Sequence, residues 1–305
     1  MNSSELVTII IPTYNQADYL SQAIESVLNQ DYIHLECIIL NDGSSDNTNE
    51  IVDSYKERIR YVRHSNIGQS KTINKGFDMA NGKYIGYLSS DDVLKSNAVS
   101  TLVKALARSP EITVVYPDFE LIDSNNKYLR LVQTEEYSLK RLEIDLVCQP
   151  GPGALFSKEI YKKAGGWNPN LVHVPDYEFW LRMAHHGNFK RIPQPLAQYR
   201  ISESSNSYRK ISSQKSMEIV DVMIHYWSKD PRSPGAESKK SIARAYILAV
   251  KSHMQSSRLI EGLKCFLRSL VINPLTPFYT STWQCLFSGL FRRMFYRYTL
   301  RKRSI

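Results

Sequence analysis

Two apolar runs separated by an amphipathic segment constrain the fold of this chain more than any other feature. Residues Leu6 to Ile11 (LVTIII) form a continuous, β-branched run, which is typical of a strand buried on both faces. From Tyr19 to Leu28, apolar residues recur three and four positions apart and predict a helix with one apolar stripe. A second apolar run follows at Leu35 to Leu40. This alternation predicts an α/β fold, with a parallel sheet covered by helices on both faces.

A polar loop follows each expected strand. The first run ends at residues 12–15 (PTYN) and the second at residues 41–46 (NDGSSD), and a third run at 84–88 ends at residues 89–92 (SSDD). The carboxyl ends of parallel strands meet at one edge of a sheet, where open α/β sheets bind their ligands. We therefore expect these three loops to lie together and to form the functional site.

The third loop contains two adjacent carboxylates, Asp91 and Asp92. Carboxylate oxygens are the ligands that Mg²⁺ and Mn²⁺ prefer, and a metal held in this way usually also binds substrate phosphates. The alternative interpretation of the pair is a solvated turn after a strand.

The type and order of the motifs resemble those of glycosyltransferase family 2. The matching pieces, which cover roughly residues 5–207, are TIIIPTYNQADYLSQAIESVLNQ, IILNDGSSDNT, NIGQSKTINKGFDMANGKYIGYLSSDD, GPGALFSKEIYKKAGGWNP, PDYEFWLRMA and PLAQYRISESSNS. The third piece is similar to a subgroup with the patterns GQSxxINKG and SDD. The resemblance implies the GT-A fold, a Rossmann-like sandwich of nucleotide-diphospho-sugar transferases, over residues 1–210, and we expect a helical extension over 211–305.

The resemblance also implies where a nucleotide-sugar would bind. Pro12 and Tyr14 are expected to flank the base, uracil or an equivalent, and Asp42 to accept a hydrogen bond from its edge. The expected donor-binding set is completed by Ser70, Ser90 and Asp91. Two structural interpretations remain open: Tyr14 as a loop aromatic that covers a helix end, and Asp42 as part of an Asp-Gly-Ser turn.

The metal motif departs from the family pattern at two positions. Ser89 stands where the family usually has a first carboxylate, and Ser202 where relatives often have a histidine. Asp91 and Asp92 remain as the implied metal ligands. We therefore expect a weakly held divalent metal, Mn²⁺ or Mg²⁺, that is bound partly by the phosphates of the donor.

The family resemblance assigns the general base to Asp176, within the text VPDYEFWLR. A base at this place would accept the proton of the acceptor hydroxyl, and in-line attack with a single base would invert the anomeric carbon. Pro175 replaces an acidic residue that often precedes the base. Pro-Asp is also a common helix start, so Asp176 has helix capping as its alternative role.

Composition favours a reduced, intracellular environment. The four cysteines are scattered, without CxxC spacing, so free thiols are expected. The N-terminus has no signal-peptide pattern, and no apolar stretch approaches the roughly 20 residues that span a bilayer. The expected location is the cytoplasm.

The C-terminal region combines aromatic and basic residues. Apolar and aromatic residues recur at helical spacing from Trp283 to Tyr298. Six basic residues lie between and after them, and there is no acid from Leu286 onward. Such a helix is expected to bind an anionic membrane surface through residues 283–303. The alternative is a core-packing helix with a solvated basic tail. No recognised nucleic-acid-binding module accompanies the charge, so nucleic acid is not an expected partner.

The sequence thus predicts an inverting glycosyltransferase that uses a nucleoside-diphosphate sugar, with UDP as the expected nucleotide. Its expected acceptor is a saccharide or a lipid-linked saccharide in surface polysaccharide synthesis, at the cytoplasmic face of the membrane. The alternative is a non-catalytic subunit that binds sugar nucleotides or glycans. Ser89 and Ser202 favour the alternative, whereas the retained carboxylates at 42, 91, 92 and 176 favour the enzyme.

Overall fold

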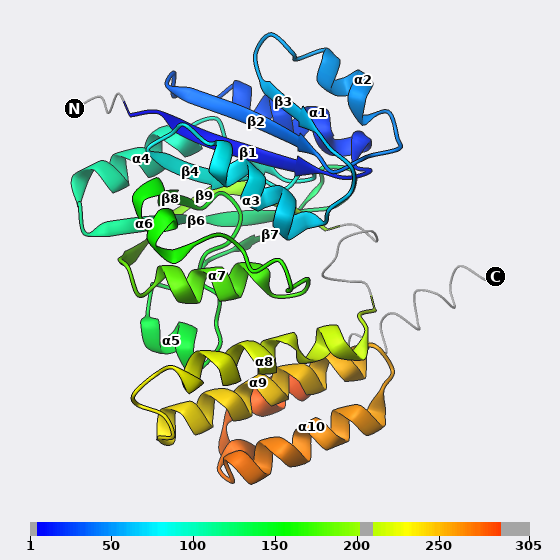
Figure 1. Ribbon diagram of the computed structural model, residues 1–305, viewed down its shortest axis with the longest axis vertical. Coiled ribbons are helices and arrows are strands. Elements are labelled where there is room, and N and C mark those ends of the chain that lie inside the picture. The colour runs from blue at the N-terminus through cyan, green and yellow to red at the C-terminus, as the bar shows by residue number, and fades with distance from the viewer. Residues whose placement is uncertain (1–4, 202–209, 288–305) are drawn as a thin grey trace, which may run out of the picture. The chain divides into compact units, whose positions relative to one another are not determined.

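The computed structural model describes residues 5–201 and 210–287, which form two compact units (Figure 1). The first unit comprises residues 5–137, 148–170 and 175–201, and the second comprises residues 138–147, 171–174 and 210–287. Ser202 and the part of the expected membrane-binding stretch beyond Phe287 lie outside the described residues.

The first unit is built on one mixed sheet of nine strands among the described residues, in the order β3-β2-β1-β4-β8-β6-β9-β5, with β7 paired to β6. The strands are β1 (Val7–Thr13), β2 (Leu35–Asn41), β3 (Arg60–Arg63), β4 (Tyr84–Tyr87), β5 (Val93–Leu94), β6 (Ile112–Ile122), β7 (Tyr128–Val132), β8 (Leu155–Ser157) and β9 (Asn188–Arg200). Strands β1 to β4 are parallel, as the alternation predicts. The other half departs from this pattern, since β8 runs antiparallel to both of its neighbours, β4 and β6.

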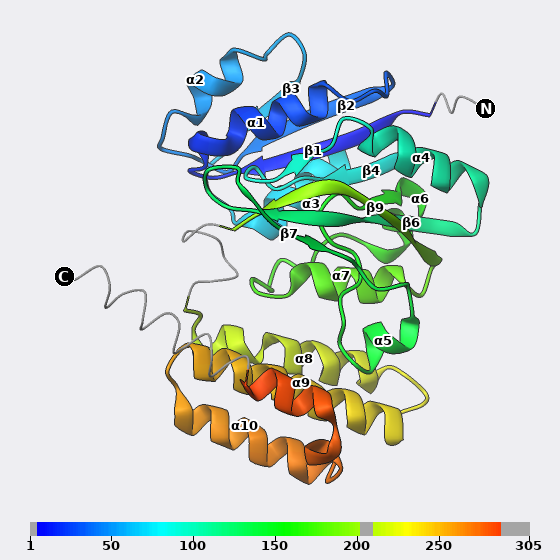
Figure 2. The ribbon, with the colours of Figure 1, turned by 180° about the vertical axis from the view of Figure 1, so that it is seen from behind.

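Helices cover both faces of the sheet. One face is covered by α1 (Ala17–Leu28), α2 (Thr48–Asp53) and α4 (Ala98–Arg108). The other is covered by α3 (Gln69–Met79), α6 (Lys158–Ala164) and α7 (Pro175–Met183) (Figures 1 and 2). The apolar run of β1 is buried on both sides, with Ile9 and Ile11 in one core and Ile10 in the other. The predicted sandwich is therefore confirmed, and it brings the loops after β1, β2 and β4 to one edge.

The second unit is helical. It contains α5 (Leu139–Glu143), α8 (Ser213–Ser228), α9 (Ala236–Gln255), α10 (Leu259–Ile272) and the short 3₁₀ helix η1 (Thr276–Phe278). The helices α9 and α10 pack against each other as a helical hairpin. No helix within residues 5–201 or 210–287 is both long and apolar enough to cross a bilayer.

Two buried glutamates attach the short stretches of this unit to its helices. The Glu143 carboxylate accepts hydrogen bonds from the Tyr226 hydroxyl and from Arg232, the latter at 3.2 Å. The Glu218 carboxylate accepts backbone N–H groups of residues 172–174, the shortest from His173 at 2.6 Å. Because unsatisfied buried carboxylates are costly, these contacts fix residues 138–147 and 171–174 within the helical unit.

Candidate active site

The loops after β1 and β2 are joined by hydrogen bonds into one surface. Asn15, which has a left-handed backbone (φ 51°), donates its N–H to Ser44 Oγ at 3.0 Å and accepts the Ser45 N–H at its Oδ1 at 2.8 Å. Next to them, Asp46 accepts the N–H of Ala17 at 3.0 Å. Tyr14 lies on this surface and is 50% exposed, so much of its ring faces solvent at the carboxyl edge.

Asp42 is buried and fixes the segment that leads into α3. Its two carboxylate oxygens accept the backbone N–H groups of Ile67 at 2.7 Å and Gly68 at 3.0 Å. His64 Nδ1 lies 3.4 Å from the same carboxylate. The structure therefore shows a loop-fixing role for Asp42 at the place where the resemblance expects a base contact, and that base contact stays a prediction.

The residue after Asp42 makes this arrangement sensitive to substitution. Gly43 has a φ of +76°, and a Cβ there would lie 2.8 Å from the Asn66 nitrogen. We expect Gly43→Ala to lower the free energy of unfolding by about 2 kcal/mol or more, because backbone strain and a backbone clash add. Gly68→Ala is the matched control: its φ is +89°, but no atom lies within 4 Å of the added methyl group. Urea denaturation of both variants measures the difference, and equal losses would contradict the clash.

The adjacent carboxylates lie in a tight turn between β4 and β5. Asp92 donates its N–H to the Ser89 carbonyl at 3.0 Å, and its Oδ1 accepts the Arg200 N–H at 2.9 Å. Burial raises the pKa of Asp91, and burial together with the neighbouring charge of Asp91 raises the pKa of Asp92 well above its usual range. Two crowded carboxylates of this kind favour the approach of a cation, which stabilises their charged forms.

Arg200, at the end of β9, holds this turn and was missed by sequence reasoning. Its side chain is buried, with the residue 1% exposed. Nε donates to the Asp91 carbonyl at 2.8 Å, Nη1 to the Asp123 carbonyl at 3.0 Å, and Nη2 to Gln22 Oε1 at 2.7 Å. The guanidinium also lies 4.5 Å from the centre of the Tyr19 ring. Arg200 lies within the motif PLAQYRISESSNS, but the sequence alone does not distinguish a buried arginine at this position from a solvated one.

Asp176 lies in the first turn of α7, and Tyr87 of β4 connects it electrostatically with the carboxylate turn. Burial raises the pKa of Tyr87 well above its usual range, and the charges of Asp176 and, more weakly, Asp92 raise it further. Close packing and Asp176 likewise raise the pKa of the Cys148 thiol, although part of that residue is exposed. Tyr87 is therefore within electrostatic range of both Asp176 and Asp92.

A network of side chains orients the helix that carries Asp176. Glu178 forms a bidentate pair with Arg182, at 2.7 and 2.9 Å, and Arg182 also donates to the carbonyls of Gly165 and Gly166. Asn74 of α3 accepts the Trp167 N–H at 2.7 Å and donates to its carbonyl at 2.8 Å. The Trp167 ring packs edge-on against Tyr87, with 5.2 Å between the ring centres. Glu178 is therefore engaged away from the site, and Trp167 fills the core beneath it.

The remaining predicted residues lie at the same edge. Ser90 is buried within the carboxylate turn, Ser70 is buried in the first turn of α3, and Pro12 is the half-buried penultimate residue of β1. The first turn of a helix is a place where backbone N–H groups often bind phosphates.

The donor set fits a divalent cation that shares its coordination with a substrate. Within the part of the chain that the structure describes, no three His, Cys, Asp or Glu side chains converge on one point. Asp91 and Asp92 supply hard oxygen ligands, and Asp92 already accepts one backbone N–H. Two carboxylates alone do not complete the coordination of such a cation. Oxygen atoms of substrate phosphates are suitable further ligands.

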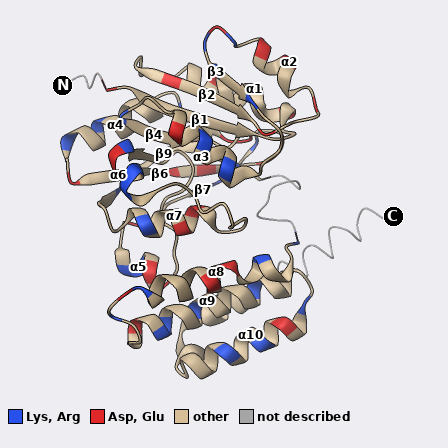
Figure 3. Cartoon of the chain, in the orientation of Figure 1, with Lys and Arg blue, Asp and Glu red and all other residues tan. Residues whose placement is uncertain are grey.

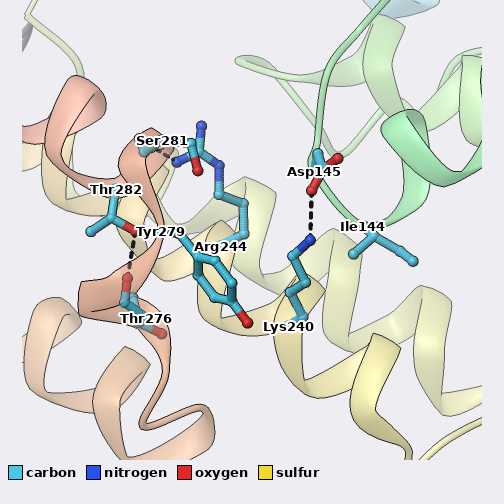
Figure 4. Close-up of a pocket in the computed structure, with 8 residues that line it drawn as sticks. All are labelled: Ile144, Asp145, Lys240, Arg244, Thr276, Tyr279, Ser281 and Thr282. Carbon is cyan, nitrogen blue, oxygen red and sulfur yellow. Dashed lines mark hydrogen bonds and ion pairs between the residues drawn. The ribbon is translucent and has the colours of Figure 1, made fainter.

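A small cavity in the helical unit contains none of the predicted site residues. It measures about 50 Å³ and lies among Ile144, Asp145, Lys240, Arg244, Thr276, Tyr279, Ser281 and Thr282 (Figure 4). Its polar groups largely bind one another, with Lys240 3.1 Å from Asp145 and Arg244 Nη1 2.9 Å from the Ser281 carbonyl. We therefore place the candidate site at the sheet edge of the first unit.

The fold is similar to that of solved sugar-nucleotide enzymes. S. aureus TarS 1–349 in complex with UDP-GlcNAc superposes with a TM-score of 0.63 at 14% identity, over 88% of this chain and 91% of that one. The mannosyltransferase PcManGT from Pyrobaculum calidifontis, in complex with GDP-Man and Mn²⁺, gives a TM-score of 0.57 at 16% identity, over 95% and 87%. The sandwich thus has the GT-A fold that the family resemblance implies.

Sequence comparison then gives the family. The model described as "Glycosyl transferase family 2" matches residues 8–165, just over half of the chain. An uncharacterized glycosyltransferase of Rickettsia prowazekii is 35% identical over 186 residues, 59% of this chain and 58% of that protein. The hyaluronan synthase of Pasteurella multocida is 29% identical over 259 residues, 79% of this chain but 26% of that protein. The chain belongs to glycosyltransferase family 2, and it spans less than two-thirds of the length of these relatives.

Proposed function

We propose that this chain is an inverting glycosyltransferase that moves a sugar from a UDP-sugar to a saccharide or lipid-linked acceptor in surface polysaccharide synthesis. The observation that carries the proposal is the turn with the adjacent carboxylates Asp91 and Asp92, which follows β4 at the carboxyl edge of the parallel strands and is held by Arg200. The expected catalytic domain is residues 1–210, and the expected extension is residues 211–305.

In the proposed donor complex, the base of the nucleotide stacks on the exposed ring of Tyr14, beside Pro12. The diphosphate lies between the first turn of α3 and the carboxylate turn. Asp91 and Asp92 would hold a divalent cation, Mn²⁺ or Mg²⁺, which when bound neutralises charge on the diphosphate. UDP is favoured because the structural neighbour with the higher TM-score of the two reported binds UDP-GlcNAc.

The proposed chemistry is a single displacement. The Asp176 carboxylate accepts the proton of the acceptor hydroxyl, the acceptor oxygen forms a bond to the anomeric carbon, and the bond from that carbon to the diphosphate oxygen breaks. Because attack and departure occur on opposite faces, the configuration of the carbon inverts. Arg182 and Asn74 act on Asp176 only through the position of α7 and of the loop before it.

The proposed acceptor is argued from named relatives, and the proposed location from the sequence of residues 283–303. Two relatives are named hyaluronan synthase and chondroitin synthase, so a polysaccharide acceptor is the first to examine. Association with the cytoplasmic face of the membrane through residues 283–303 stays a prediction. The second candidate function, a binding subunit without turnover, is favoured by Ser89 in place of a carboxylate.

Calorimetric titration of UDP and GDP, with and without Mn²⁺, tests the donor site. We expect UDP to bind more tightly with Mn²⁺, and Asp91→Ala to remove that gain, because one of two metal ligands is lost. Asp53→Ala, an exposed carboxylate at the end of α2, is the matched control and should bind as the unsubstituted chain does. Tighter binding of GDP would redirect the donor assignment. Metal-dependent UDP binding without sugar transfer to any acceptor would favour the binding subunit.

A further inference from the structure

Exposed apolar side chains are concentrated at the C-terminal end of the described chain. Residues 259–287 contain about as many large exposed apolar side chains as the rest of the described residues together. They are Leu259, Ile260, Leu263, Leu267, Val271, Leu275, Phe278, Trp283 and Phe287. Contiguous exposed apolar surface on a water-soluble protein marks an interaction site more often than scattered apolar residues do.

The helix α10 has the reverse of the usual pattern for a helix that packs on a protein core. Its buried residues are small: Gly262, Cys265 and Ser269. At 3.6 residues per turn, its larger apolar residues Ile260, Leu263, Leu267 and Val271 lie on the opposite side, and Val271 is 84% exposed. The small residues face inward and leave the large apolar side chains exposed on the outer side.

Basic residues accompany this outer side, and exposed aromatic residues follow α10 in the chain. Lys264 and Arg268 are exposed on α10, each next in sequence to a residue of the apolar stripe. Figure 3 shows Lys and Arg positions along this helix in blue. Trp283 is 46% exposed, and its Nε1 donates to the Pro277 carbonyl at 2.8 Å. Its ring lies 6.3 Å from that of Phe287. Exposed tryptophan and phenylalanine beside lysine and arginine are typical of surfaces that enter the interface of a membrane.

Two other binding partners for this surface, a second copy of the chain and the chain's own residues beyond Phe287, fit its positive charge less well. A second copy of the same face would bring together two patches that each carry two cations, Lys264 and Arg268, against one acid, Glu261, because a twofold interface pairs the patch with itself. The chain beyond Phe287 carries six basic residues and no acid, so it would also meet like charge on this face. An anionic surface satisfies both the charge and the apolar stripe.

We propose that the outer side of α10, together with Phe278, Trp283 and Phe287, docks on a bilayer that contains anionic lipid. The helix lies in the plane of the interface, with its apolar side chains in the lipid and Lys264 and Arg268 among the phosphate groups. The docking itself is independent of sugar transfer. Its use, delivery of the enzyme to a lipid-linked acceptor, rests on the proposed function.

Vesicle co-sedimentation of the full chain tests this surface. We expect binding to vesicles of phosphatidylcholine with phosphatidylglycerol, weaker binding to phosphatidylcholine alone, and weaker binding at high salt. The double variant Leu263→Gln and Leu267→Gln should bind about tenfold more weakly, because two exposed leucines no longer enter the lipid. The control double variant, Ile33→Gln and Leu131→Gln, replaces exposed apolar residues of the first unit and should bind as the unsubstituted chain does.

Tryptophan fluorescence gives a second readout within the same samples. Trp167, Trp180 and Trp227 are buried, so Trp283 is the exposed one of the chain's four tryptophans. We expect a blue shift on addition of the anionic vesicles, and no shift for Trp283→Phe. Vesicle binding that the leucine substitutions leave unchanged would overturn the proposal, as would a stable dimer that these substitutions dissociate. UDP titration of the same variants should be unaffected, so a failure of the donor site is distinguishable from a failure of docking.

Discussion

Asp176→Asn is expected to lower the rate of sugar transfer by about 10²- to 10⁴-fold while UDP binding persists. The amide keeps the size of the carboxylate but cannot accept the proton of the acceptor hydroxyl. Release of UDP from the donor in the presence of acceptor measures the rate, and calorimetry with UDP and Mn²⁺ measures the donor site.

Glu178→Gln is the matched control on the same helix. The Glu178 carboxylate is paired with Arg182, so this variant should lose some stability but keep a transfer rate within a few-fold of the unsubstituted chain. If Glu178→Gln lost as much activity as Asp176→Asn, the base would not be assignable to Asp176. If Asp176→Asn kept full activity, the single-displacement chemistry would need another proton acceptor.

Arg200→Met is expected to produce the largest loss of stability among substitutions at the site, about 3 kcal/mol or more. The substitution removes donors from the carbonyls of Asp91 and Asp123 and from Gln22, and it leaves two buried carboxylates without their nearest cation. The midpoint of urea denaturation measures the loss. Metal-dependent UDP binding should also weaken, since the turn that holds Asp91 loses its support.

Arg130→Met, an exposed arginine of β7, provides the comparison and should stay within about 0.5 kcal/mol of the unsubstituted chain. An Arg200→Met chain as stable as Arg130→Met would mean that Arg200 does not support the turn. A stable Arg200→Met chain with normal Mn²⁺-dependent UDP binding would contradict both parts of this prediction.

In the parallel half of the sheet, β1, β2 and β4 could be predicted because each is a short apolar run. The fourth strand, β3, has the sequence RYVR, which lacks this pattern. The other half of the sheet could not be predicted. β8 has three residues, too few for a period of two to be recognised. β9 contains Pro193 and Pro195, which weaken a strand prediction, and its pairing with β6 shifts register near them.

The candidate site divides in the same way. Asp91, Asp92 and Asp176 lie in short motifs, so the sequence alone, with the family resemblance, indicates them. Tyr87 and Arg200 also lie within the quoted motifs, but their contacts could not be predicted because they involve neighbours distant in sequence: Asp176 for Tyr87, and Asp91 for Arg200. The contacts of Asp42 with residues 67 and 68 likewise depend on how β2 meets α3.

The contact between Arg200 and the carboxylate turn has a consequence for biosynthesis. Arg200 follows Asp91 by 109 positions, and a ribosome delivers the chain from its N-terminus. The strands β1 to β4 are therefore translated, and free to pair, well before the residue that holds the carboxylate turn exists. A nascent or truncated chain that ends before β9 would have the loops after β1 and β2 but no finished carboxylate turn. Competence for sugar transfer is thus deferred until translation of the first unit is nearly complete.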